Sequence, residues 1–80
     1  GGKSIKTVVL EMITSDAEDI SIVEHIRLNF PDSKFDINHV SWYRSTWFRD
    51  GIIEPKHAPR RSKVYKAWLR DSQKENATAP

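Results

Sequence analysis

The amino-acid sequence predicts a mainly α fold in which three helices are followed by a small two-stranded β-hairpin. Apolar residues recur at helical spacing in three segments before residue 50, and helix start and stop residues border those segments. Residues 52–54 and 63–69 instead carry β-branched and aromatic side chains, on either side of a basic loop. With 80 residues the chain has room for one domain. It contains no cysteine, which excludes disulfides and cysteine-ligated zinc and favours an intracellular protein.

The first predicted helix covers residues 5–13. Ser4 is placed to cap its N-terminus. One buried face is indicated by apolar residues at the i, i+3, i+4, i+7 and i+8 positions, namely Ile5, Val8, Val9, Met12 and Ile13. The polar and acidic residues 14–19 then predict a turn.

The second predicted helix has two start points that fit. Ser21 and Glu24 match a capping box, and Ser15 and Glu18 match another, which would begin the helix earlier. Pro31 predicts its end, because proline disfavours helical geometry in the residue before it. The apolar stripe of this helix consists of Ile22, Val23, Ile26 and Phe30.

The third predicted helix covers Ile37–Arg49, after a short connector. Asp36 is expected to cap it, and Gly51 to close it in the left-handed conformation. A rotation of about 100° per residue gathers an apolar side from Val40, Tyr43 and Trp47, widened by Ile37 and Phe48. The opposite side then carries Asn38, Ser41, Trp42, Ser45 and Arg49. Two helices joined by a short turn predict a helix-turn-helix.

The segment after Gly51 predicts the hairpin. One strand is expected at residues 52–54 and the other within residues 63–69, around a basic loop with two prolines, so that a wing spans residues 55–66. An alternative stays open, because Val64, Tyr65, Trp68 and Leu69 also fit a helix capped by Ser62. The hairpin is preferred because Val, Tyr and Trp favour strands. Residues 1–3 are expected to be a cloning scar or disordered start, residues 4–70 the domain, and residues 71–80 a flexible tail or linker.

Two patterns, each made of two short stretches of the sequence, resemble known DNA-binding domains. Residues 47–54 (WFRDGIIE) and 60–66 (RRSKVYK) look like the end of the reading helix, the first strand and the wing of winged helix-turn-helix regulators. Residues 30–34 (FPDSK) and 39–45 (HVSWYRS) are similar to a block in N-terminal DNA-binding domains of phage and mobile-element replication initiators and of nucleases that target an origin. The resemblance implies a winged helix-turn-helix that binds DNA as the targeting module of a larger protein.

Charge is unevenly distributed along the chain. Residues 34–70 hold nine basic and three acidic residues, a net charge of +6, whereas residues 1–33 hold three basic and six acidic residues, a net charge of −3. A segregated basic half is typical of polyanion binders. We therefore expect double-stranded DNA as the partner, in the cytoplasm of a bacterial or phage-infected cell. A homodimer, or a further domain after residue 70, is compatible with this expectation.

The residues expected to contact DNA fall into three groups. Lys34 precedes the reading helix, where it is placed for a phosphate contact. The reading helix is expected to enter the major groove with Asn38, Ser41, Trp42, Ser45 and Arg49, and with Arg44 on its flank. The wing is expected to touch phosphates or the minor groove with Lys56, His57, Arg60, Arg61 and Lys63. The alternative roles for Trp42 are packing under the wing, packing into the core through a tilt of the helix, or contact with a protein partner.

Other classes of function find little support in the sequence. His25, His39 and His57 fall on three different elements without ligand spacing, so we expect no metal site. There is no triad-like spacing, no glycine-rich phosphate loop and no apolar run near the ~18 residues of a membrane span. We expect no enzyme activity, no cofactor and no membrane association. The rival function is a protein-interaction domain that docks on transcription or replication machinery, which an exposed Trp42 and the acidic first half would favour.

Overall fold

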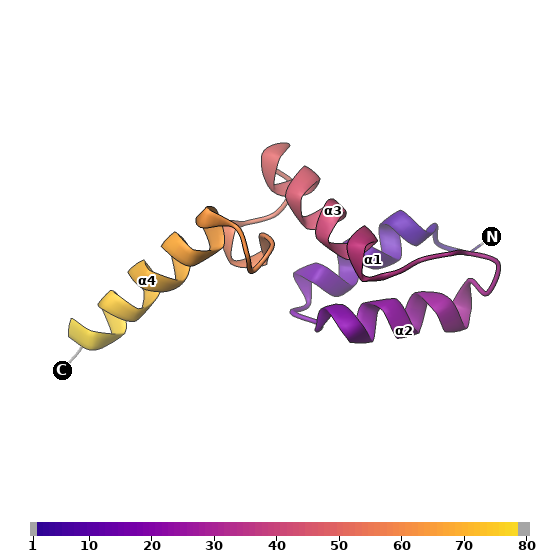
Figure 1. Ribbon diagram of the computed structural model, residues 1–80, viewed down its shortest axis with the longest axis horizontal. Coiled ribbons are helices and arrows are strands. Elements are labelled where there is room, and N and C mark those ends of the chain that lie inside the picture. The colour runs from indigo at the N-terminus through magenta and orange to yellow at the C-terminus, as the bar shows by residue number, and fades with distance from the viewer. Residues whose placement is uncertain (1, 79–80) are drawn as a thin grey trace.

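Four helices and one 3-10 turn make up the computed structural model, which describes residues 2–78, with side chains to residue 73. In order they are α1 (Ile5–Thr14), α2 (Asp19–Asn29), α3 (Ile37–Arg49), the turn η1 (Pro55–His57) and α4 (Lys63–Thr78). α1 packs on α2 and α2 on α3, while η1 contacts both α3 and α4 (Figure 1). α4 projects away from the other helices, so that the molecule measures 50 × 24 × 21 Å.

The hydrophobic core lies between α1, α2 and α3, and the loops on either side of α3 close it. The connector between α2 and α3 contributes Phe35, and the segment after α3 contributes Ile53. The other buried members of this cluster come from the three helices and are Val9, Ile13, Ile22, Val23, Ile26, Val40 and Trp47. All seven belong to the predicted apolar faces, so the helical periodicity of the sequence is confirmed for these three helices.

Local capping explains where α1 begins but not where α2 begins. The Ser4 hydroxyl accepts a hydrogen bond from the Thr7 N–H, as predicted. α2 starts at Asp19 after Glu18, whose side chain makes no capping bond, so both predicted capping boxes are wrong. Ser15 is used to end α1, and Ser21 lies inside α2 on its exposed side. The burial of one face of α2, rather than a local cap, sets its start.

α3 begins and ends as predicted. The Asp36 carboxylate accepts hydrogen bonds from the N–H groups of Asn38 and His39, and the His39 ring bonds back to the Asp36 N–H. At the other end Gly51 has a φ of +75°, the left-handed conformation that favours glycine. The Ile52 N–H reaches the carbonyl of Trp47 at 2.8 Å, which completes a Schellman motif.

The predicted hairpin and wing are absent between residues 2 and 78, and the mainly α fold with a two-stranded wing is wrong. Residues 63–69 belong instead to α4, which was the alternative, and the Ser62 hydroxyl accepts a hydrogen bond from the Tyr65 N–H at 3.2 Å. Residues 52–54 therefore have no strand to pair with. Strand preference is strongly context-dependent, and here Val64, Tyr65 and Trp68 are each partly buried as parts of a helix.

α4 continues as helix to Thr78, beyond Arg70, where the sequence predicts the domain to end. Residue 1 and residues 79–80, which belong to the predicted start and tail, lie outside the described residues.

Candidate nucleic-acid interface

The outer face of α3 presents polar and aromatic side chains to solvent. The helix sequence, INHVSWYRSTWFR, contains no aspartate or glutamate. All five residues that the sequence places opposite the core are exposed: Asn38, Ser41, Trp42, Ser45 and Arg49. A 13-residue helix is about 20 Å long, and an α-helix fits the major groove of B-form DNA. The amide, hydroxyl and guanidinium groups on this face are those that can bond base edges.

The two tryptophans of α3 lie in opposite environments. Trp47 is 3% exposed, and Tyr43 stacks on it with ring centroids 4.6 Å apart. The core position predicted for Trp47 is therefore confirmed, and Tyr43 is partly buried against the same cluster. Trp42 is 60% exposed and forms a T-shaped pair with Tyr43, with ring centroids 5.2 Å apart. The exposed indole leaves a flat apolar surface beside the polar groups of the outer face.

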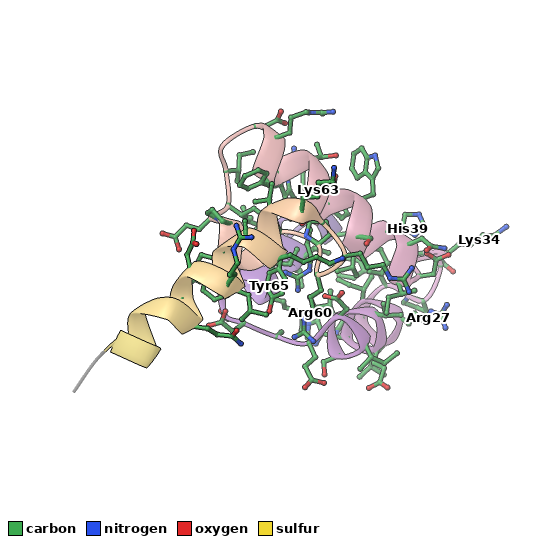
Figure 2. All side chains as sticks on the ribbon, turned by 60° about the vertical axis from the view of Figure 1, so that its left-hand side comes forward. Arg27, Lys34, His39, Arg60, Lys63 and Tyr65 are labelled. Carbon is green, nitrogen blue, oxygen red and sulfur yellow. The ribbon has the colours of Figure 1, made fainter. Side chains whose placement is uncertain are left out.

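The segment that enters α4 runs alongside the first half of α3. Pro59, Arg60 and Arg61 line one side of a groove of about 290 Å³, and the other side is lined by Asp19, Ile37, Asn38 and Ser41. Figure 2 shows Lys63 at the start of α4, and Arg60 belongs to the segment that precedes this helix. The structure thus brings Arg60 and Arg61, which the sequence assigns to a wing, next to Asn38 and Ser41, which it assigns to a helix.

Lys34 is held close to the start of α3 by its neighbours. Phe35 is 3% exposed, and its carbonyl accepts a hydrogen bond from Arg27 Nε at 2.8 Å, which ties the connector to α2. Lys34 itself is exposed and extends away from the start of α3 (Figure 2). Among the described side chains, the free cations of this surface make no ion pair with an acid; they are Lys34, Arg60, Arg61 and Lys63.

Arg44 is not on the accessible surface that the sequence assigns to it. Its Nε and Nη2 both donate to Asp19 Oδ1, at 2.9 and 2.6 Å, and its Nη1 donates to the His57 carbonyl at 2.7 Å. The Arg44 side chain is only 12% exposed. Each of the three guanidinium nitrogens therefore donates a hydrogen bond inside the protein, and Arg44 is left out of the candidate interface. This pair escaped the sequence analysis because 25 residues separate its members and neither has a local signal.

His57 and Lys56 lie in different environments, and only His57 conflicts with its predicted role. The His57 ring is buried at 5% exposure, so it is not a surface group for phosphate. Burial lowers the pKa of His57, although the Asp16 carboxylate 3.6 Å from Nδ1 opposes that shift. Lys56 is exposed, with its Nζ 3.9 Å from a Glu54 carboxylate oxygen.

Acidic groups near the candidate interface are mostly engaged by protein donors. The Asp19 carboxylate, which lines the groove, is paired with Arg44. Desolvation would raise the pKa of the Asp36 carboxyl, but the backbone N–H donors of His39 and Asn38 together hold it below its ordinary value. Asp50 lies 3.6 Å from Arg49 Nε, so the charge of Arg49 is partly offset.

The described residues contain neither a metal site nor a membrane-spanning helix. No group of three or more His, Asp or Glu side chains is arranged there to hold a metal ion. None of the helices between residues 2 and 78 has the length and hydrophobicity that a bilayer crossing requires. No family model, no curated protein and no solved structure matches this chain. The candidate interface therefore rests on its own geometry.

Proposed function

We propose that this domain binds double-stranded DNA in a sequence-specific manner. The outer face of α3 lies in the major groove, where Asn38 and Arg49 can each make two-bond contacts to a base edge. Arg60, Arg61 and Lys63 contact phosphates beside it, and Lys34 contacts the backbone at the start of α3. The domain serves as the targeting module of a larger phage or mobile-element protein, in the cytoplasm of a bacterial or phage-infected cell.

One observation carries this proposal. An acid-free helix presents hydrogen-bonding side chains on one exposed face, and two unpaired arginines line the groove beside that face. Binding to duplex DNA needs both kinds of group, because cations supply affinity through the phosphates and groove-facing donors supply specificity. The arginines and two hydrogen-bonding side chains of α3, Asn38 and Ser41, line the same groove.

The test compares two surfaces on two duplexes. A duplex selected from a random pool and an unrelated duplex are titrated at one salt concentration against variants of each surface. Asn38→Ala and Arg49→Ala should each cost about 1–3 kcal/mol on the selected duplex and much less on the unrelated one, since each removes a base contact. Arg60→Ala or Arg61→Ala should weaken binding to both duplexes similarly, because phosphates carry no sequence information.

Asn29→Ala is the matched control for Asn38→Ala. Asn29 is exposed at the end of α2, and its amide bonds the His25 carbonyl within the same helix, so its loss should leave DNA affinity unchanged. Equal losses on both duplexes for the α3 variants would show that α3 does not read bases. A random pool that yields no enriched duplex, with no affinity at low salt, would rule out the proposal.

A protein partner is the second candidate function, and exposed apolar residues favour it. Trp42, Ile37 and Ile20 are 60%, 48% and 53% exposed. Exposed aromatic side chains such as Trp42 are typical anchors of protein interfaces. The lack of any duplex affinity, combined with a Trp42→Ala variant of unchanged stability, would direct the search to such a partner.

A further inference from the structure

Arg44 connects three segments that lie far apart in the sequence. From the middle of α3 it bonds Asp19 in the first turn of α2 with two nitrogens and the carbonyl of His57 in η1 with the third. Arginine suits this arrangement because its planar group carries donors in a fixed fork, which a lysine lacks. The Arg44–Asp19 pair and the His57 carbonyl are called the Arg44 clamp below.

The Arg44 clamp lies immediately before the basic residues of the candidate interface. Ala58, next to the clamped carbonyl, is 1% exposed, and Pro59 follows with a fixed φ. Arg60 and Arg61 then emerge into the groove beside Asn38. Only Ala58 and Pro59 separate His57, which carries the clamped carbonyl, from Arg60, so the position of that carbonyl limits where the arginines can lie.

Residues 57–62 make few other hydrogen bonds or ion pairs with the rest of the described protein. Their described backbone hydrogen bonds are local, from the His57 N–H to Glu54, from the Ala58 N–H to Pro55 and from the Ser62 N–H to Pro59. A weaker contact joins the His57 ring to the exposed Asp16 carboxylate at 3.6 Å. Without the clamp, the segment would depend on the apolar contacts of its buried residues.

We propose that Arg44 and Asp19 are positioning residues for DNA binding: they hold residues 58–61 against α3 so that Arg60 and Arg61 reach the same duplex as the outer face of α3. The inference rests on the proposed function for its DNA part, whereas the docking of the segment is a property of the free protein. Neither residue touches the DNA. Their effect on affinity is transmitted through the arginines.

The sign of the Asp19 effect separates this inference from simple electrostatics. Removing an acid close to DNA removes repulsion, so electrostatics alone predicts that Asp19→Ala and Asp19→Asn both strengthen binding. Positioning predicts that Asp19→Ala weakens it. Asp19→Asn should behave differently from Asp19→Ala, because both clamp bonds end on the same carboxylate oxygen, Oδ1, and an asparagine keeps one such acceptor.

The experiment measures duplex affinity and its salt dependence for a small set of variants. Asp19→Ala should weaken binding at least about fivefold and lower the slope of log affinity against log salt by up to about 1.8, which corresponds to two lost phosphate contacts. Asp19→Asn should stay within about twofold of the unchanged protein, since a neutral hydrogen bond keeps the geometry. Glu18→Ala is the matched control, because it removes the neighbouring charge from a side chain without a capping bond.

Two further variants connect the effect to the arginines. In a protein that already carries Arg60→Ala and Arg61→Ala, Asp19→Ala should cause no further loss of affinity, because the groups it positions are gone. Arg44→Lys should resemble Asp19→Ala, since it keeps the charge but not the fork of donors. Full affinity for Arg44→Lys would overturn the inference, as would additive losses in the combined variant.

A measurement without DNA keeps the two proposals separate. Amide ¹⁵N relaxation reports fast backbone motion at Arg60 and Arg61. Both amides should be as rigid as those of α3 in the unchanged protein and distinctly more mobile in Asp19→Ala, with the helices unaffected. Rigid amides in Asp19→Ala would overturn the docking role. A protein in which they become mobile but which never binds duplex DNA would keep the docking and refute the DNA-binding proposal.

Discussion

The imidazole of His57 is the clearest case of a single residue whose chemistry is set by its surroundings. His57 lies in η1 and is only 5% exposed, and its own backbone carbonyl accepts a hydrogen bond from Arg44. Burial disfavours the charged ring and lowers its pKa, and the Asp16 carboxylate only partly offsets this. The folded protein therefore prefers the neutral form of His57.

This preference leads us to expect a stability that decreases in mild acid. An unfolded histidine binds a proton near pH 6.5, whereas folded His57 does so at lower pH, so between the two values the unfolded chain holds more protons. The free energy of unfolding should fall as the pH drops below about 6.5 and level off below the folded pKa. Urea unfolding at several pH values measures this dependence.

The control for this prediction is another histidine. His57→Gln should reduce the pH dependence, whereas His25→Gln, at an exposed site on α2, should leave it intact. An NMR titration in which the His57 ring protonates above its ordinary pKa would contradict the expectation.

Among the helices, α4 depends most on its own start. Its described helix contacts are mainly with η1, and the Ser62 hydroxyl caps its first turn by accepting from the Tyr65 N–H. α2, by contrast, starts without a side-chain cap and is held by three buried residues of its apolar face, Ile22, Val23 and Ile26. A local cap therefore matters more for α4 than for α2.

Two serine substitutions test this difference between the helices. Ser62→Ala should cost about 1 kcal/mol, because it removes an N-cap acceptor. Ser21→Ala, at an exposed position inside α2, should be neutral or stabilising by about 0.5 kcal/mol, since alanine is the better helix former. Backbone chemical shifts of residues 63–68 and thermal unfolding measure both effects. A destabilising Ser21→Ala would show that the predicted capping box at Ser21 forms after all.

On the scale of the whole molecule, the two halves of the chain carry net charges of opposite sign and form different helices. The net charge of residues 1–33 is −3 and that of residues 34–70 is +6. The first range forms α1 and α2, whereas the second forms α3, η1 and the start of α4, which carry the candidate interface. A duplex would therefore meet the basic part of the chain, with the acidic helices contributing mainly to the other surfaces.

We expect duplex affinity to fall steeply with salt for this reason. If about five phosphate contacts form, affinity should drop by at least ~100-fold between about 50 and 200 mM salt, because each contact releases condensed counterions. Fluorescence anisotropy with a labelled duplex measures the slope. An affinity that hardly changes over this range would mean that apolar contacts, such as those of Trp42, dominate the interface.

How well the site could be predicted depends on the range of the interactions involved. The exposure of Asn38, Ser41 and Arg49 follows from a rotation within one helix, and this part of the prediction is confirmed. The burial of Arg44 and His57 follows from contacts between segments that are distant in the sequence, and no pattern around either residue announces them. The sequence assigns Arg60 and Arg61 to a wing that is absent between residues 2 and 78, and nothing in it predicts that they share a groove with α3.

The sequence by itself determined α1, α3, the apolar core faces and the end of α2. These features depend on helical periodicity, on caps such as Asp36 and on Gly51, all of which act within about two turns of helix. Only the tertiary structure decided the start of α2 and the state of residues 63–69, because aromatic and β-branched side chains suit a strand or a buried helix face equally well until a packing partner is present. Here the partner is η1, which Arg44 and Asp19 hold in place, and α4 packs against it.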